Sequence, residues 1–382
     1  MSLPFERPFV TQLERRLQEE CPRIQVLTGP RQVGKTTGVR QLLTRCAFPC
    51  HYANADDLFS ADRSWLIEQW QRARLLGAGA LLVIDEIQKV PNWSETLKSL
   101  WDAAGGALRV VVLGSSSLQL QSGLSESLAG RFELTRVYHW SFGELRDAFG
   151  YDLDRYLLYG GYPGAIDYEH DFDRWYGYLK DSIIESVVGK DILHNRKVGS
   201  PALFRQAFEI LCRYPAQEVS YTKLLGQLQD KGNTDLVKYY IELYSGSFLM
   251  SSLDKFSPKT WLSRSSSPKV MPACPALYTM TQGPRLLDDP DRRGRMLELA
   301  AGIRLGQLPG ELYYWREKSY EVDFVYCYQG NIYAVEVKSG RRIASKGMEV
   351  FLKNNPGSIP VILTADNFEV FSEDPLAYLR RM

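Results

Sequence analysis

The chain has 382 residues, more than one hydrophobic core ordinarily serves, so two or three domains are expected. Hydrophobic residues make up 45% and charged residues 24%, which excludes a disordered class and favours a soluble globular protein. The formal net charge is only +1, so the chain as a whole carries no nucleic-acid-binding charge. Any DNA-binding surface must therefore be a local patch.

Cysteine spacing and the length of apolar runs indicate the cellular compartment of the protein. The six cysteines contain no Cys-x-x-Cys pair, and the one cluster, Cys46 with Cys50 and His51, has no second ligand pair. The thiols are therefore expected to be reduced and not to bind metal. No apolar stretch approaches the roughly 18 residues of a membrane span, and residues 1–7 lack the apolar core of a signal peptide. The expectation is a cytoplasmic protein without a membrane partner.

The first strongly patterned region joins a helix, a strand and a glycine-rich turn. Phe9, Leu13 and Leu17 recur at helical spacing, and the apolar run 24–27 predicts a short strand. Residues 29–36, Gly-Pro-Arg-Gln-Val-Gly-Lys-Thr, match the phosphate-loop pattern G-x-x-x-x-G-K-[ST] at every defined position. A helix-like run follows, and this strand–loop–helix order argues against the alternative of a chance glycine-rich turn.

The chemistry of this loop depends on its backbone. Glycines let the backbone N–H groups converge on an anion, and the start of the following helix adds a positive dipole end. Lys35 is expected to reach the β- and γ-phosphates, and the Thr36 hydroxyl to ligate Mg²⁺. The residues expected to contact the nucleotide are Gly29, Pro30, Arg31, Gln32, Val33, Gly34, Lys35, Thr36 and Thr37.

A second buried strand brings two acids toward the same edge of the sheet. Residues 80–84 are apolar, and Asp85 and Glu86 follow them directly, as at the carboxyl end of a parallel strand. Asp85 is predicted to bind Mg²⁺ through a water, and Glu86 to be the catalytic residue that polarises the attacking water. The alternative is a strand that ends in solvated acids without a function. Because the acidic pair follows a phosphate loop in the sequence, the functional interpretation is favoured.

Two further positions each keep two interpretations. The run 108–113 predicts another buried strand. A resemblance to nucleoside triphosphatases with a glutamate after the magnesium aspartate implies that this strand lies between the phosphate-loop strand and the acidic strand. The run ends in serines, of which Ser115 or Ser116 fits a γ-phosphate sensor as well as a Gly-Ser turn. Arg131 fits an arginine finger that completes a neighbouring copy's active site in an oligomer, and equally an intramolecular salt bridge. The guanine-recognition motif Asn-Lys-x-Asp does not occur after the strand-like segment 133–140, which favours an adenine nucleotide.

Short segments over nearly the whole chain carry a family resemblance. They are Gly-Pro-Arg-Gln-Val-Gly-Lys-Thr-Thr at 29–37, Val-Ile-Asp-Glu-Ile-Gln-Lys-Val-Pro at 83–91, Trp-Ser-Phe-Gly-Glu-Leu at 140–145, and residues 114–116, 128–131, 159–163, 190–192, 314–316, 321–324 and 336–340. These segments resemble a family of prokaryotic AAA-type ATPases, in which the AAA module precedes a C-terminal domain of unknown function. The resemblance implies an AAA-type P-loop ATPase over residues 1–145, with ATP and Mg²⁺ as its cofactors. It leaves the biological role open.

The middle of the chain is expected to hold three parts. Residues 146–200 are helical in pattern and predict a helical lid or linker, with aromatic residues more typical of a core than of a ligand platform. Residues 201–256 predict a winged-helix-like domain whose third helix spans 234–244. Because Lys238 gives that helix only a thin basic face, contact with DNA and contact with protein are both open. Residues 257–290, rich in Ser, Pro and Arg, predict a linker.

The last part, residues 291–382, predicts a restriction-endonuclease-like domain. Asp323 lies on one strand, and Glu336 and Lys338 lie two residues apart on the next strand, past a hairpin turn. This order resembles the D…E-x-K signature of PD-(D/E)XK nucleases. In that reading Asp323 and Glu336 bind Mg²⁺ and Lys338 activates water, with Glu298 as a further metal ligand. The alternative is a Glu–Lys pair on a solvent face.

The predicted fold class is therefore α/β. It combines a P-loop AAA-type parallel sheet with a helical lid, a winged-helix-like middle domain and a C-terminal restriction-endonuclease-like α/β domain. The first functional hypothesis is an ATPase coupled to DNA binding or cleavage, with Asp323, Glu336 and Lys338 as catalytic residues of the nuclease-like site. The second is an ATP-dependent regulator that binds a protein partner and whose nuclease-like domain is inert.

Overall fold

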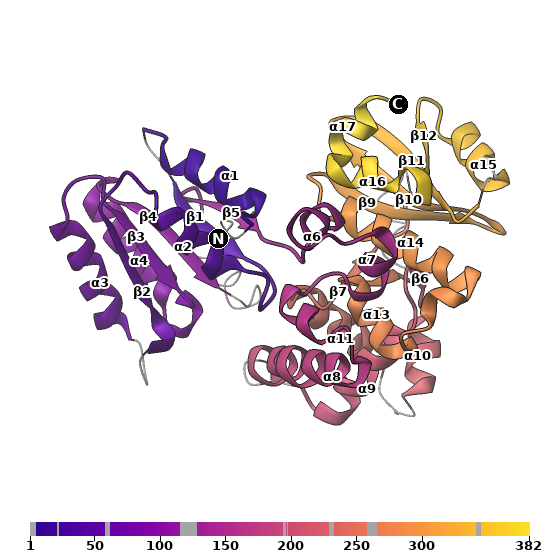
Figure 1. Ribbon diagram of the computed structural model, residues 1–382, viewed down its shortest axis with the longest axis horizontal. Helices are drawn as coiled ribbons and strands as arrows, with labels where there is room; N and C mark the ends of the chain where they lie inside the picture. The colour runs from indigo at the N-terminus through magenta and orange to yellow at the C-terminus, as the bar shows by residue number, and fades with distance from the viewer. Residues whose placement is uncertain are drawn as a thin grey trace. The chain divides into compact units, whose positions relative to one another are not determined.

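The computed structural model describes residues 5–20, 23–57, 62–114, 128–193, 196, 198–228, 233–257, 266–340 and 345–382. The chain forms two compact units, residues 1–138 and 139–382 (Figure 1). Each unit has a hydrophobic core of its own. Within the described residues, no helix is long and apolar enough to cross a membrane.

The first unit is built on a five-stranded parallel sheet. Its strands are β1 (Ile24–Thr28), β2 (Cys50–Asn54), β3 (Leu81–Asp85), β4 (Arg109–Gly114) and β5 (Phe132–Arg136). Their order is β2-β3-β4-β1-β5, so β4 lies between the phosphate-loop strand β1 and the acidic strand β3, as predicted. Every residue of β1 and β3 is buried, which is typical of the apolar strands of a parallel sheet.

Helices cover this sheet. They are α1 (Pro8–Leu17), α2 (Lys35–Leu43), α3 (Arg63–Leu75) and α4 (Trp93–Ala104). Buried residues of α3 and α4, such as Trp70 and Leu97, join Ile24 and Val26 of β1 in one apolar cluster. Helix α1 packs on α2 at Gly38, where a Cβ would lie 2.4 Å from Cζ of Phe9, so only glycine permits this approach. The packing fixes α2, and with it the end of the phosphate loop.

The second unit begins with a helical region. Its helices are α6 (Phe142–Phe149), α7 (Leu153–Tyr159) and α8 (Phe172–Gly177), followed by π-helical stretches at Tyr178–Ile184 and Val187–Leu193. Ser141 and Glu144 form a capping box that starts α6. Trp175 and Tyr162 are buried, in agreement with the expectation that the aromatic residues here form a core. The region is helical, as its sequence pattern predicts.

A small antiparallel sheet with three helices follows. The elements are α9 (Pro201–Cys212), β6 (Gln217–Glu218), α10 (Tyr221–Gln227), α11 (Thr234–Gly246), β7 (Met250–Leu253) and β8 (Lys269–Pro272). The strand order is β6-β8-β7. Strand β8 lies within 257–290, where a linker was predicted, and α13 (Pro275–Gln282) follows it. The prediction of a linker was wrong for these residues, because short apolar runs around Val270 and Leu277 are buried in the unit.

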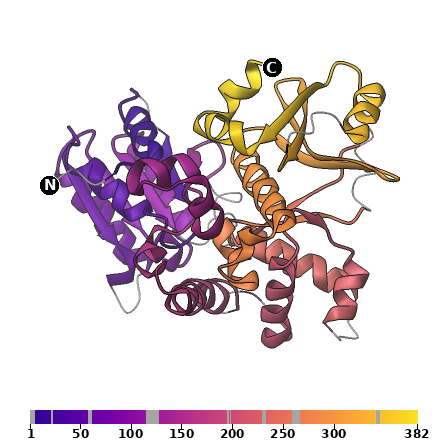
Figure 2. The same cartoon turned by 45° about the vertical axis from the view of Figure 1, so that its right-hand side comes forward.

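The C-terminal part has a four-stranded mixed sheet of order β12-β11-β10-β9. Its elements are α14 (Pro290–Gly306), β9 (Glu311–Glu317), β10 (Tyr320–Tyr328), β11 (Asn331–Lys338), α15 (Lys346–Asn354), β12 (Ile359–Thr364), α16 (Ala365–Glu373) and α17 (Pro375–Arg380). Strands β9, β10 and β11 are antiparallel, whereas β12 runs parallel to β11. Helix α14 lies against this sheet (Figure 2). Arg146 of α6 forms ion pairs with Glu369 and Glu373, which ties α6 to α16.

Candidate functional site

The phosphate-loop sequence forms a tight turn between β1 and α2. Gly34 has a φ of 89° and Gln32 a φ of 59°, so the loop needs left-handed backbone at two places. Gly29 lies against the main chain of Val137, whose carbonyl oxygen would be 2.0 Å from a Cβ at position 29. The nine predicted nucleotide contacts, 29–37, occupy this loop and the first turn of α2. Its backbone therefore has the curvature that an anion cradle requires.

Lys35 curves back over the loop it follows. Its side chain is nearly buried, and its Nζ donates hydrogen bonds to the carbonyl oxygens of Gly29 at 2.8 Å and Pro30 at 2.6 Å. The ammonium group is thus held at the mouth of the turn. A phosphate bound by the loop would find this positive charge beside it.

The two predicted oxygen ligands of Mg²⁺ are in direct contact. The Thr36 hydroxyl donates to Oδ2 of Asp85 at 2.6 Å, and the backbone N–H of Glu86 donates to the other oxygen, Oδ1, at 2.9 Å. Asp85 is 3% exposed. Glu86 has a φ of 53° and accepts a hydrogen bond from the side-chain amide of Gln88. A hydroxyl and a carboxylate at this distance fit a Mg²⁺ site, because this ion takes oxygen ligands.

Two residues at this site were not predicted. Tyr52 of β2 donates its hydroxyl to Oδ2 of Asp85 at 2.9 Å, and burial, followed by the charge of Asp85, raises the pKa of Tyr52 to about 12. Arg7 is buried and donates to the carbonyl oxygens of Val33 at 2.8 Å and Tyr138 at 3.1 Å. The sequence offers no local signal for either contact. The contact of Tyr52 with Asp85 depends on β2 pairing with β3.

Arg131 lies at the opposite edge of the sheet. It directly precedes β5, and the β1 residue nearest to it in register is Ile24, whereas the phosphate loop follows Thr28 at the other end of β1. Its guanidinium forms a two-pronged ion pair with Asp102, at 2.7 and 3.0 Å. Of the two interpretations of Arg131, the structure contains the intramolecular salt bridge. The predicted sensor Ser115, with its neighbour Ser116, lies outside the described residues.

In the C-terminal sheet, the D…E-x-K residues are close in space but already paired. Oδ2 of Asp323 accepts a hydrogen bond from the backbone N–H of Val337 at 2.8 Å. Nζ of Lys338 lies 2.6 Å from Oε1 of Glu336, whose side chain is almost fully buried. Burial, followed by the charge of Glu298, raises the pKa of Asp323 to about 7. The contact between Glu336 and Lys338 shows that these two residues lie on the same face of β11, as the alternation of the sequence predicts.

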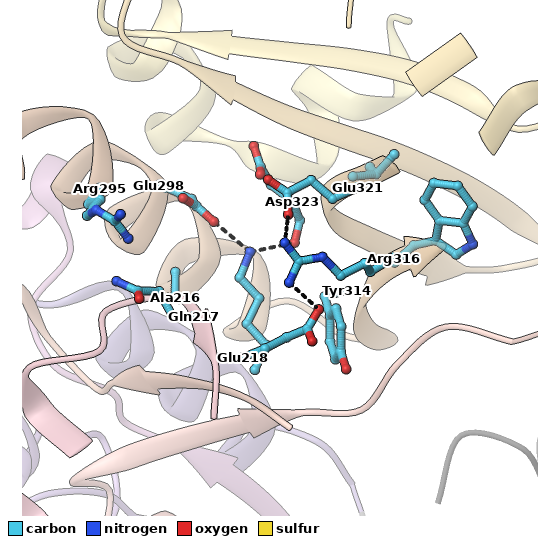
Figure 3. Close-up of a pocket in the computed structure, with 12 residues that line it drawn as sticks. Ala216, Gln217, Glu218, Arg295, Glu298, Tyr314, Arg316, Glu321 and Asp323 are labelled. Atoms are coloured by element: carbon cyan, nitrogen blue, oxygen red, sulfur yellow. Dashed lines mark hydrogen bonds and ion pairs between the residues drawn. The ribbon is translucent and has the colours of Figure 1, made fainter. Parts of the chain in front are cut away.

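A cavity of about 300 Å³ opens beside this cluster. In Figure 3, Glu298 from α14 and Asp323 from β10 approach the cavity from neighbouring elements, and Arg316 from β9 faces Glu218. Among the described residues, no group of three or more His, Cys, Asp or Glu side chains is placed to hold a metal ion. In the predicted metal set, one oxygen each of Glu298, Asp323 and Glu336 is paired with a different donor, and metal binding by the set stays a prediction.

Three family models match consecutive parts of the chain. One is described as an AAA domain and matches residues 22–146. The other two are domains of unknown function, DUF8612 over residues 150–282 and DUF4143 over residues 296–374. None of the three is described as a nuclease or as a DNA-binding domain.

The chain is also similar to whole proteins of bacteria and archaea. Uncharacterized proteins of Mycobacterium tuberculosis and Mycobacterium bovis are each 29% identical to it over 333 residues, which cover 85% of this chain and 72% of theirs. An uncharacterized protein of Methanocaldococcus jannaschii is 25% identical over 329 residues, 79% of this chain and 72% of its own.

Two solved structures are similar at a lower level. A Walker-type ATPase of Pyrococcus abyssi matches 74% of this chain and 99% of its own, with a TM-score of 0.49 and 16% identity. The RuvB Holliday junction branch migration motor of Thermotoga maritima matches 68% of this chain and 95% of its own, with a TM-score of 0.35 and 15% identity. From the phosphate-loop geometry and the matched models, the chain carries an AAA-type P-loop ATPase domain followed by two domains of unknown function.

Proposed function

We propose that the first unit binds ATP with Mg²⁺ and hydrolyses it at the carboxyl edge of its parallel sheet. The observation that carries this proposal is the contact of Thr36 with Asp85, which joins the phosphate loop to the acidic strand. Neither residue type is unusual alone. Their pairing at the end of a glycine-rich turn, next to the start of α2, is what phosphoryl transfer requires.

The roles follow from the position of each group. The backbone N–H groups of the loop, Pro30 excepted, would surround the β- and γ-phosphates, and Lys35 would leave the loop carbonyls to pair with them. Thr36 and Asp85 would hold Mg²⁺, and the ion would supply positive charge to the phosphate oxygens. Glu86, which follows Asp85 directly at the end of β3, would orient and polarise the attacking water.

For the second unit we infer a non-catalytic role, in which it binds the partner that ATP binding and hydrolysis regulate. Its winged-helix-like region over 201–256 is supported by the order of its helices and strands. The exposed residues of α11 include Asp235, Lys238 and Glu242, and Lys238 lies 3.8 Å from Asp235. Two acids and one paired lysine do not suit a phosphate backbone. This favours a protein partner over DNA, and with it the regulator hypothesis.

The division at residues 1–145, 146–200, 201–256 and 291–382 remains our proposal for the parts of the chain. The restriction-endonuclease-like character of the last part is supported by its helix–strand–strand–strand order and by the placement of Glu336 and Lys338 on one face. An arginine-finger role of Arg131 would require release of Asp102.

Two substitutions test the ATPase. Lys35→Ala is expected to abolish nucleotide binding, because no other lysine lies within the loop. Glu86→Gln is expected to retain ATP binding, while the rate of hydrolysis falls by about two orders of magnitude or more. Fluorescence titration with an ATP analogue measures the first effect and phosphate release the second. Lys223→Ala and Glu95→Gln, both at exposed positions, serve as charge-matched controls. Wild-type ATP affinity in Lys35→Ala would refute the proposed site.

A plasmid assay distinguishes a nuclease from a non-catalytic second unit. Supercoiled DNA incubated with Mg²⁺ or Mn²⁺, with and without ATP, is expected to stay intact with the wild-type protein. Nicking that Lys338→Ala abolishes would contradict the non-catalytic role and restore the nuclease hypothesis.

A further inference from the structure

Lys269, at the start of β8, is a buried lysine that the ATPase does not use. It is 6% exposed, and its Nζ lies 2.5 Å from Oε1 of Glu298. The same Nζ donates to the main-chain oxygen of Asp323 at 3.0 Å and lies 4.6 Å from the ring centroid of Phe324. The ammonium group thus meets a carboxylate, a carbonyl and an aromatic face, the three kinds of group that stabilise a buried cation.

The backbone fixes this lysine from both sides. β8 is the middle strand of its sheet, and Lys269 pairs with Glu218 of β6 and with Leu253 of β7. Lys269 therefore reaches out of one sheet to Glu298 on α14 and Asp323 on β10, which belong to the C-terminal part. Burial of an ammonium group is costly unless it is paired, so this lysine is positioned by its partners rather than tolerated at random.

We propose that Lys269 is the resident cation of Glu298 in the carboxylate cluster of Glu298, Asp323 and Glu336, and that this cluster joins β8 to the C-terminal sheet instead of binding a divalent metal. The proposal is independent of the ATPase. It assigns to the C-terminal cluster a structural role, with the middle sheet supplying the positive charge.

The competition for oxygen atoms supports this role. Mg²⁺ requires several oxygen ligands in near-octahedral geometry at about 2.1 Å. Oε1 of Glu298 is paired with Lys269, Oε1 of Glu336 with Lys338, and Oδ2 of Asp323 with a backbone N–H. Oε2 of Glu336 is buried and has no hydrogen-bond partner. Each carboxylate keeps a second oxygen, but a divalent ion that used these oxygens would have to share the site with the Lys269 ammonium group, 2.5 Å from Oε1 of Glu298.

Mn²⁺ binding tests the proposal directly. Free Mn²⁺ is followed by electron paramagnetic resonance during titration of the full-length, nucleotide-free protein. The wild type and Asp323→Asn are expected to bind the same number of ions, because the cluster takes none. Lys269→Met, which removes the charge but keeps the length of the side chain, is expected to gain one ion per chain. Asp323→Asn in that background should remove it again.

Two further measurements complete the test. Lys269→Arg retains the charge and is expected to bind no additional Mn²⁺. The melting temperature of Lys269→Met should fall and should recover when Mn²⁺ is added, because the ion replaces the lost charge. An ion bound by the wild type and lost in Asp323→Asn would overturn the proposal, as would a folded Lys269→Met that gains none. If Lys269→Met does not fold, the comparison of wild type with Asp323→Asn decides.

Discussion

Substitution of Gly29 by alanine is the sharpest test of how the phosphate loop is held. The added Cβ would lie 2.0 Å from the carbonyl oxygen of Val137, whereas carbon and oxygen atoms in contact normally stay about 3.3 Å apart. One of the two segments must therefore move by roughly 1.3 Å. Hydrogen bonds hold the second segment, from the N–H of Val137 to Thr28 at 2.7 Å and from Arg7 to Tyr138 at 3.1 Å. We expect the loop to move.

A displacement of about 1 Å at a catalytic site can lower the rate by about 10²-fold, or about 2.7 kcal/mol of transition-state stabilisation. Gly29→Ala is therefore expected to lose about two orders of magnitude in kcat/KM for ATP, measured by phosphate release at a series of ATP concentrations. Gly143→Ala is the matched control, because a Cβ there meets no atom within 4 Å. It should leave ATP hydrolysis unchanged. Wild-type kcat/KM in Gly29→Ala, together with an unchanged melting temperature, would refute the steric argument.

Two other substitutions test the electrostatics of each unit. Tyr52→Phe removes one of the hydrogen bonds that Asp85 accepts. The Mg²⁺ concentration at half-maximal ATPase activity is therefore expected to rise by about three- to ten-fold. An unchanged Mg²⁺ titration would contradict this role of Tyr52. Because the pKa of Asp323 is raised to about 7, the folded protein retains a proton there that the unfolded chain loses near pH 4. The free energy of unfolding of the wild type should therefore fall as the pH rises from about 4 through 7, by about 4 kcal/mol, whereas urea unfolding of Asp323→Asn should lack this fall.

The nucleotide site was predictable because its determinants are local. The Gly-Lys-Thr turn, the apolar strand before it and the acidic pair after β3 are each contiguous in sequence, and the parallel sheet brings their carboxyl ends to one edge. Tyr52 and Arg7 escaped prediction for the opposite reason. Their partners, Asp85 and the carbonyl of Val33, lie on other elements, so the contacts exist only after the sheet order and the packing of α1 are known.

The carboxylate cluster shows how a correctly predicted local pattern can leave its chemistry open. Alternation along β11 places Glu336 and Lys338 on one face, and the hairpin brings Asp323 beside them, as the sequence predicts. In our proposal the cation that faces Glu298 decides the role of the cluster, and that cation, Lys269, comes from a strand within the segment predicted to be a linker. A lysine at the head of the apolar run Lys269-Val-Met-Pro is the signal that was available. A buried strand admits an ammonium group only where an acid receives it, and Glu298 is that acid.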